Sequence, residues 1–170
     1  MAQVRVRPAV AEDAEAIRQI YNHEVTTATS TFDLVPRSLA DQQRWIAERS
    51  GAFSAIVAVG SGDDGADPGV IGFASLSPYK LRAAYSTTVE DSVYVDRDRG
   101  GRGVGTLLLT SLIDVAAASG FHAVIARIEA SGTASRALHA ACGFDLVGIE
   151  RQVGRKFNRW LDVAVMQRLL

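Results

Sequence analysis

The apolar positions along the chain alternate between the two-residue period of strands and the three-to-four-residue period of helices. Val4 and Val6 are separated by an arginine, which predicts a short strand in which alternate side chains face the core. Ile17, Ile20 and Tyr21 then recur at the spacing of one helical face. The chain therefore begins with a strand that is followed by a helix.

The next segments predict a loop, a second helix and a pair of strands. Residues 26–37 are rich in Thr and Ser, which favours a loop, and the Ser-Leu-Ala-Asp sequence at 38–41 has the spacing of a capping box. The apolar runs 53–59 and 70–76 are joined by a segment rich in Gly, Asp and Pro, which requires a turn. We expect these two runs to form a hairpin.

The second half of the chain continues the alternation. Residues 89–95 have a β-branched strand pattern, and an apolar helical stripe at 104–116 follows and ends at Gly120. The remaining expected elements are a strand at 123–128, a short helix at 135–142, and strands near 146–153 and 160–169. The order β-α-α-β-β-β-α-β-α-β-β, without repeats or a long linker, indicates one α/β domain over residues 1–170.

Composition agrees with a compact domain and excludes several classes of partner. With 170 residues, of which 48% are hydrophobic and 22% are charged, the chain can bury the core of one domain. A net charge of −1 gives no long-range attraction for nucleic acid or an anionic membrane, so we expect neither as a partner. The single cysteine, Cys142, excludes an internal disulfide, and we expect neither a signal peptide nor a bilayer-spanning run. These features favour the cytoplasm.

A loop rich in glycine and arginine lies between the strand at 89–95 and the helix that follows it. Its backbone N–H groups converge at a helix N-terminus, where they can bind phosphate. Thr106 and Leu107 follow its last glycine, which excludes a Walker loop, and the third glycine of a dinucleotide fingerprint is missing. The alternative is a turn that only joins a strand to a helix. The residues concerned are Arg97, Arg99, Gly100, Gly101, Arg102, Gly103 and Gly105.

This loop resembles the coenzyme A pyrophosphate loop of the GNAT-type N-acetyltransferases. That loop has Arg or Gln, two free positions, Gly, one free position, and then Gly or Ala. Gly103 and Gly105 occupy the two glycine positions, but Gly100 stands at the Arg or Gln position. The departure is minor if backbone N–H groups do most of the binding, and Arg99 and Arg102 can still face the phosphates.

Further segments resemble one branch of that superfamily, the phosphinothricin and methionine sulfone/sulfoximine acetyltransferases. They follow the order of the family and span almost the whole chain. The segments are I-Y-N-H-E-V at 20–25, S-T-F-D at 30–33, the run at 79–95, S-R-A-L-H-A-A-C-G-F at 135–144, and V-G-R-K-F-N-R-W-L-D at 153–162. The resemblance implies the GNAT fold, a mixed central sheet flanked by helices, in which splayed central strands bind acetyl-CoA.

The resemblance also implies a set of cofactor-binding residues for acetyl-CoA as co-substrate, without a metal. Backbone groups of Val93 and Val95 would bond the pantetheine arm. Gly132 stands where the branch usually has an Asn that contacts the cofactor, so one hydrogen bond is missing or is made by a neighbouring hydroxyl. The full expected set is Val93, Tyr94, Val95, Gly100, Gly101, Arg102, Gly103, Val104, Gly105, Thr106, Gly132 and Ser135.

Glu90 is the candidate general base. A carboxylate inside a central strand is costly unless it has partners or a task. An amine acceptor arrives mostly protonated and must lose a proton before it attacks a thioester, and Glu90 could take that proton, directly or through water. The resemblance assigns the base to this glutamate. The alternative is a structural Glu that is ion-paired with Arg82 or Lys80. Asp91 departs from the family, where relatives often carry His.

His139 is the candidate general acid. In many GNAT enzymes a Tyr four residues before the Gly-Phe pair protonates the departing thiolate, and His139 occupies that position before Gly143. This branch commonly has His there, so the resemblance implies a catalytic role. The alternative is a structural helical histidine.

The expected acceptor-binding residues are Phe32, Lys80, Arg82, Tyr85 and Glu90. Two cations with aromatic residues suit a small amino acid that carries a carboxylate and a second polar head, such as phosphinothricin or methionine sulfoximine. A solvated basic loop is the alternative for the cations. Because these relatives tend to be dimers, we expect a homodimer.

These observations predict an acetyl-CoA-dependent N-acetyltransferase that acts on a small amino-acid-like amine by direct attack in a ternary complex. Two alternatives stay open. A peptide or protein N-acetyltransferase would use the same cofactor site with an open groove, and a non-catalytic acetyl-CoA-binding module would keep the loop without a working base.

Overall fold

The computed structural model describes residues 4–60, 69–99 and 103–170. Its helices are α1 (Ala14–Thr27), α2 (Leu39–Ala47), α3 (Val104–Ala118) and α4 (Thr133–Ala141). Its strands are β1 (Arg5–Pro8), β2 (Ala55–Val59), β3 (Val70–Pro78), β4 (Thr88–Val95), β5 (Ala123–Glu129), β6 (Asp145–Lys156) and β7 (Arg159–Leu169).

The strands form one seven-stranded sheet in the order β1-β2-β3-β4-β5-β7-β6. All neighbouring pairs are antiparallel except β4 and β5, which run parallel at the centre of the sheet. The β4–β5 pairing runs only from Thr88↔Ala123 to Glu90↔Ile125. Both strands continue beyond these pairs, so they part after Glu90. This mixed sheet with separating central strands confirms the expected fold class.

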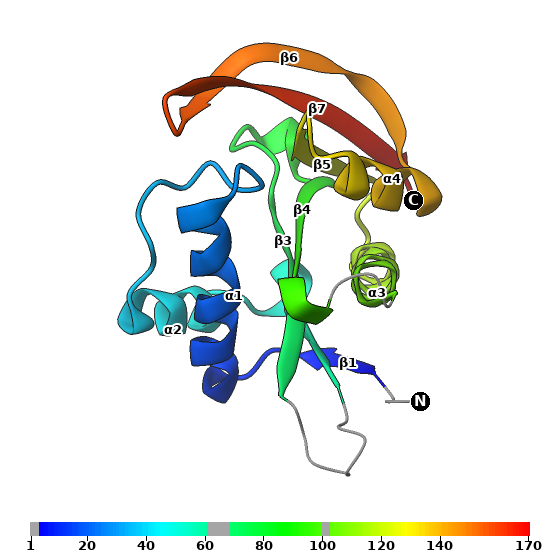
Figure 1. The fold of residues 1–170 in the computed structure, drawn as a ribbon. Helices are drawn as coiled ribbons and strands as arrows, with labels where there is room; N and C mark the ends of the chain where they lie inside the picture. Colours follow the sequence, from blue (N-terminus) through cyan, green and yellow to red (C-terminus); the bar gives the residue numbers. More distant parts are fainter. Residues whose placement is uncertain (1–3, 61–68, 100–102) are drawn as a thin grey trace.

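Helices cover both faces of the sheet, with α1 and α2 on one side and α3 and α4 on the other (Figure 1). The strand period assigns the side chains of β2 to these two layers. Val57 and Val59 are buried in the cluster that contains Ile17 of α1. Ile56 and Ala58 are buried in the cluster that contains Leu108 of α3. A strand that is apolar on both faces reflects burial between two helical layers.

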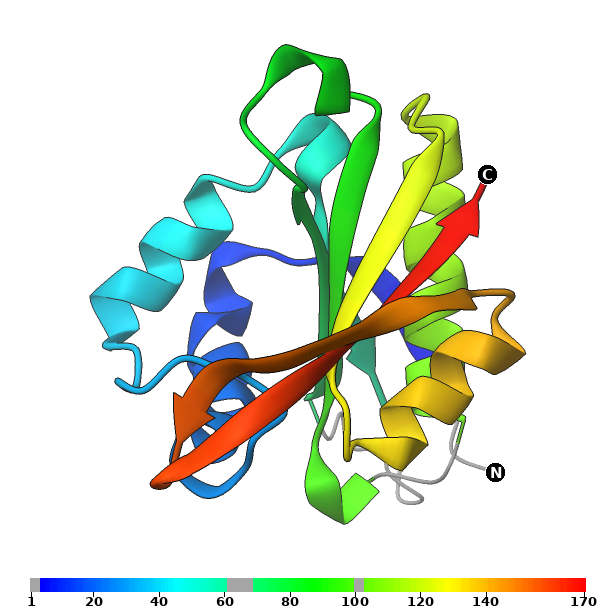
Figure 2. The same cartoon turned by 90° about the horizontal axis from the view of Figure 1, so that it is seen from above.

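The β6–β7 hairpin extends the sheet beyond β5 and crosses over the other strands when the molecule is seen from above (Figure 2). Phe157 and Asn158 form its turn, with φ of 48° and 58°. Two successive residues with positive φ match the twist of a tight hairpin. Several apolar side chains of this hairpin stay exposed, including Val147 at 62% and Trp160 at 61%.

The predicted order of the larger elements is confirmed, and only their bounds differ. β2 begins at Ala55 because residues 51–53 form a short 3-10 helix, and α4 begins two residues before Ser135. A 3-10 helix at Ala83–Tyr85, between β3 and β4, was not expected. Among the described residues, none of the helices combines the length and the apolar character that a membrane crossing requires.

The capping box at the start of α2 is confirmed and gives the first prediction. Ser38 Oγ accepts a hydrogen bond from the backbone N–H of Asp41 at 3.1 Å, and the Asp41 carboxylate accepts one from the Ser38 N–H at 3.4 Å. Ser38→Ala leaves a helical N–H without its partner, so the free energy of unfolding in urea should fall by about 1 kcal/mol. Ser38→Thr keeps the acceptor oxygen and serves as the control. Equal stability of the Ala and Thr variants would contradict the role of the cap.

Candidate active site

A cavity of about 990 Å³ opens where β4 and β5 part. Its walls come from the separated ends of these two strands, the end of α1 and the loop after it, the first turn of α3, α4, and the β6–β7 hairpin. β4 remains paired with β3 as far as Val95↔Gly72, so only its other edge is left open beyond Glu90. Backbone N–H and C=O groups on this edge need partners, which an extended ligand arm can supply.

The first turn of α3 forms one end of the cavity. Gly103 is the N-cap of α3 with φ of 78°, a left-handed conformation that favours glycine. Gly103, Gly105 and Thr106 line the cavity, whereas the Val104 side chain is buried in the core beside them. The free N–H groups of this helix end suit a phosphate. The expected phosphate-binding residues Gly100, Gly101 and Arg102 lie outside the described residues.

Arg97 is held beside this helix end by a carboxylate that the sequence did not single out. Its guanidinium donates to both carboxylate oxygens of Glu24, at 2.7 and 2.9 Å, and Ser30 Oγ donates to the same carboxylate. Burial raises the pKa of Glu24, but the bonds from Arg97 and Ser30 outweigh it and hold that pKa below its usual value. The pair links α1 to the start of the segment expected to bind phosphate, and the Arg97 side chain is 57% exposed.

The open edge of β4 presents the residues expected to hold the cofactor arm. Val93, Tyr94 and Val95 all line the cavity. The Val side chains pack toward α3, and the Tyr94 ring stacks on Phe73 at 5.3 Å on the α1 side, as the strand period requires. Burial raises the pKa of the Tyr94 hydroxyl, which therefore stays protonated.

The start of α4 faces this edge across the cavity. Gly132 and Ser135, both expected from the sequence to bind the cofactor, line the cavity. Gly132 is the N-cap of α4, and its N–H donates to the backbone oxygen of Glu129 at 2.8 Å. A Cβ atom at Gly132 would come within 3.0 Å of that same oxygen, so a larger residue would require a shift of the loop. Gly132 therefore shapes the loop at this wall and adds no side-chain contact.

Glu90 stands where β4 and β5 begin to part and lines the cavity. Burial raises its pKa; Arg127 opposes this rise, while Asp91 and Glu150 add to it. Glu90 takes part in none of the ion pairs between described residues, so pairing with Lys80 or Arg82 is not seen. A half-buried carboxylate with a raised pKa in a cavity is suited to accept a proton.

His139 forms a buried pair with Asp91. Nε2 lies 2.9 Å from Asp91 Oδ2, and Nδ1 lies 2.7 Å from the backbone oxygen of Ser135. Burial lowers the pKa of His139, but its hydrogen bond to the Asp91 carboxylate outweighs this effect and the pKa is raised. Because the Ser135 oxygen can only accept, Nδ1 carries a hydrogen, and the contact of Nε2 with the Asp91 carboxylate favours the imidazolium form, in which both N–H groups are in use.

This pairing constrains the acid role predicted for His139. The ring lines the cavity, but to donate a proton to a ligand it must first release Asp91 or Ser135. Asp91 Oδ1 is buried and has no hydrogen-bond partner within the described part of the chain. The sequence identified the departure at Asp91 but not its contact with His139, because 48 residues separate the two.

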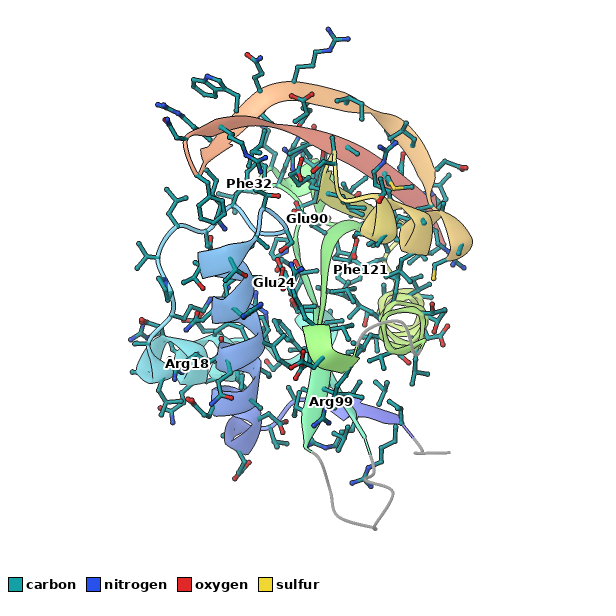
Figure 3. The ribbon with its side chains drawn as sticks, viewed as in Figure 1. Arg18, Glu24, Phe32, Glu90, Arg99 and Phe121 are labelled. Atoms are coloured by element: carbon teal, nitrogen blue, oxygen red, sulfur yellow. The ribbon has the colours of Figure 1, made fainter. Side chains whose placement is uncertain are left out.

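Of the predicted acceptor-binding side chains, Phe32 and Glu90 line the cavity, whereas Lys80, Arg82 and Tyr85 do not. A Cβ atom on Gly154 of β6 would lie 2.2 Å from the Phe32 ring, so the ring packs directly on the backbone of the hairpin. Figure 3 shows Phe32 and Glu90 beneath this hairpin. Lys80, Arg82 and Tyr85 are exposed in the segment between β3 and β4, outside the described residues that line the cavity.

Two charged residues near Glu90 were not predicted from the sequence as part of the site. Arg127 of β5 lines the cavity, and Glu150 of β6 pairs with it. A charged residue inside an apolar strand was the signal that identified Glu90, and Arg127 within the run 123–128 gives the same signal. The contact with Glu150 depends on the β6–β7 hairpin and has no local signature.

The buried Lys156 also lay outside the predicted set. It is 4% exposed at the end of β6, and its Nζ donates to the backbone oxygen of Thr31 at 2.8 Å. This bond ties the loop after α1, which carries Phe32, to the β6–β7 hairpin. The position of that loop therefore depends on a contact between distant segments of the chain.

Comparisons with known proteins agree with this geometry. Residues 6–165 match the acetyltransferase (GNAT) domain family. The chain is 41% identical to a phosphinothricin N-acetyltransferase of Streptomyces coelicolor, over 99% of this chain and 98% of that one. It is 37% identical to an L-methionine sulfoximine/L-methionine sulfone acetyltransferase of Pseudomonas aeruginosa, over 95% and 92% of the two chains.

A solved structure of a phosphinothricin acetyltransferase from Sinorhizobium meliloti, in complex with acetyl-CoA, has the same fold. It aligns with a TM-score of 0.89 and 38% sequence identity, over 98% of this chain and 88% of that one. The family match and the relatives extend over nearly the whole chain. The chain therefore belongs to the acetyltransferase (GNAT) domain family and is similar to its phosphinothricin and methionine sulfoximine/sulfone N-acetyltransferases.

Proposed function

We propose that this protein transfers the acetyl group of acetyl-CoA to the amine of a small amino-acid-like acceptor, of the phosphinothricin or methionine sulfone/sulfoximine type. The acceptors named for its relatives support this substrate class. The observation that carries the proposal is the position of Glu90, a half-buried carboxylate where β4 and β5 part that takes part in none of the ion pairs between described residues. One cavity there can hold both substrates, so direct attack in a ternary complex needs no acyl-enzyme.

Two parts of the cavity suit acetyl-CoA, which supplies the acetyl thioester when it is bound. The N–H groups around Gly103 and Gly105 would hold the pyrophosphate, and the open edge of β4 from Val93 to Val95 would bond the pantetheine arm. Val104 would contribute only its backbone, because its side chain is buried. Ser135 and Gly132 would border the arm from α4.

Glu90 would act as the general base in this mechanism. It would accept a proton from the acceptor amine, directly or through water, and so produce the nucleophile. The raised pKa of Glu90 sets the pH dependence, because a protonated carboxyl group cannot accept a further proton. Activity should therefore fall as pH falls through the pKa of Glu90.

His139 would stabilise the departing thiolate of coenzyme A. The Asp91–His139 pair keeps a positive imidazolium in the cavity wall on the α4 side. This charge can stabilise a developing thiolate, and proton donation to it would require the imidazolium to release one of its two acceptors.

Phe32, Lys80, Arg82 and Tyr85 remain the proposed acceptor-binding residues of the rim. The acceptor class can be tested with a panel of amines, assayed for free thiol released from acetyl-CoA. The panel would contain phosphinothricin, methionine sulfone, methionine sulfoximine, ordinary amino acids and short peptides. Preference for peptides would favour the alternative of a peptide or protein N-acetyltransferase, and inactivity with measurable acetyl-CoA binding would favour a non-catalytic module.

We also propose a cytoplasmic homodimer, for which the exposed apolar side chains of the β6–β7 hairpin are the supporting observation. Val147, Val153, Phe157 and Trp160 are between 52% and 62% exposed.

Light scattering should give a mass of twice the 18.1 kDa of one chain. Trp160→Glu should shift the mass toward one chain, because a buried charge without a partner is costly. Val10→Glu, at a 45% exposed position on the α1 side, is the control. A monomeric wild-type protein would contradict the proposal.

The cofactor site gives a prediction at Gly105. A side chain there would point between Leu138 of α4 and the cavity, with its Cβ atom 3.1 Å from Leu138 Cδ2. Gly105→Val should therefore block the approach of the pyrophosphate and raise the KM for acetyl-CoA by about tenfold or more, or ~1.4 kcal/mol. Gly148→Val in β6, where a Cβ atom meets nothing within 4 Å, is the matched control. An unchanged KM in folded Gly105→Val would refute the phosphate site.

The base gives a prediction at Glu90. Glu90→Gln keeps the shape of the side chain but cannot accept the proton, so kcat at neutral pH should fall by about 10²–10⁴. Activity of the variant should recover as pH rises, because more of the amine then arrives deprotonated. Acetyl-CoA affinity and thermal unfolding should change little. Near-normal kcat at neutral pH in the folded variant would exclude Glu90 as the base.

A further inference from the structure

One face of the separated strands carries a cluster of the candidate base Glu90 together with the charged side chains of Arg127 and Glu150. Glu90 pairs in register with Ile125, so the two side chains share a face of the sheet, and Arg127 follows two residues later on that face. Glu150 belongs to the same face, because it pairs with Val163, which in turn pairs with Glu129 of β5. This is the face away from α3.

Arg127 is the cation of this cluster and reaches the cavity. Its guanidinium nitrogens donate to both carboxylate oxygens of Glu150, in one case at 3.1 Å. A guanidinium has five N–H donors, and this bidentate contact uses two of them. The Arg127 side chain is 33% exposed and lines the cavity together with Glu90. Glu150 therefore fixes the orientation of Arg127 and leaves it donors for a ligand.

The charges in this cluster complement those of a free amino acid. At the reacting end an α-amino acid carries an ammonium and a carboxylate separated by one carbon atom. Glu90 and Arg127 present a negative and a positive group on one face of neighbouring strands in one cavity, close enough to interact electrostatically. The amine of the acceptor must reach Glu90 to lose its proton. The α-carboxylate of the acceptor then lies within reach of a cation beside Glu90.

We propose that Arg127, oriented by Glu150, binds the α-carboxylate of the acceptor amino acid while Glu90 receives its amine. This inference rests on the proposed function and identifies the residue that selects amino acids over simple amines. Lys80 and Arg82 are exposed on the segment before β4 and do not line the described part of the cavity. They are left to contact the distal polar head of the acceptor at the rim.

The experiment compares two acceptors that differ only in the carboxylate: methionine sulfone and the amine obtained by decarboxylating it. Arg127→Met keeps the length of the side chain but removes its charge and donors. Its KM for methionine sulfone should rise by about 10- to 150-fold, the range that corresponds to ~1.5–3 kcal/mol for a hydrogen bond to a charged group. Its KM for the decarboxylated amine and its KM for acetyl-CoA should change little. Because Arg127 lowers the pKa of Glu90, the pH profile of kcat should move to higher pH by the same amount for both acceptors.

Arg82→Ala is the comparison variant, and its KM should rise equally for both acceptors because both keep the distal sulfone. Arg127→Lys provides a second variant if Arg127→Met is unstable. Arg127→Lys keeps the charge but loses the planar fork, so its KM for methionine sulfone should lie between those of the wild type and Arg127→Met. A large loss in Arg82→Ala with an unchanged KM in both Arg127 variants would overturn the inference. Equal rises in the KM of Arg127→Met for both acceptors would also overturn it, because Arg127 would then act on Glu90 or on the fold.

Failure of the proposed function gives a different result. Wild-type protein that acetylates amines or peptides but no free amino acid would refute both the proposed acceptor and the role of Arg127. Wild-type protein that acetylates methionine sulfone, together with unaffected Arg127 variants, would refute the role of Arg127 alone.

Discussion

The arrangement of the site depends on the short parallel pairing between β4 and β5. The two strands pair only from Thr88↔Ala123 to Glu90↔Ile125 and then part. If the pairing continued, backbone hydrogen bonds would close the centre of the sheet and remove the cavity. Because it stops there, one edge of β4 keeps its backbone groups for a ligand, and Glu90 stands at the point of divergence. The β6–β7 hairpin continues the sheet on the far side of the opening.

Three ion pairs join most of the charged groups in this cavity, whereas Glu90 takes part in none of the ion pairs between described residues. Glu24 is paired with Arg97, Asp91 with His139, and Glu150 with Arg127. Each pair joins two elements of the cavity wall, so the same contacts hold the wall together and reduce the cost of burying its charges. Glu90 has no such partner among the described residues, and burial raises its pKa. This contrast supports the proposed role of Glu90 as the base.

Much of the fold and part of the site could be predicted from local patterns. The capping box at 38–41, the hairpin 53–76 and the apolar stripe of α3 depend on neighbours in the sequence, and the structure contains all three. Glu90 was identified as a charge inside an apolar strand, and it lies in the cavity. The positions of Lys80 and Arg82 could not be predicted in this way. Both residues precede β4 closely in the sequence, but neither lies in the cavity wall among the described residues.

The sequence by itself determined the order of the elements, the face of β4 that carries Glu90, and the family to which the chain belongs. These features follow from residue periods and from motifs within short segments. Only the tertiary structure decided which distant groups meet: Asp91 with His139 across 48 residues, Arg127 with Glu150 across 23, and Arg97 with Glu24 across 73. Such contacts have no local signature, because they depend on how the helices and the hairpin pack around the separated strands. The fold follows from local pattern, whereas the electrostatics of the site follow from packing.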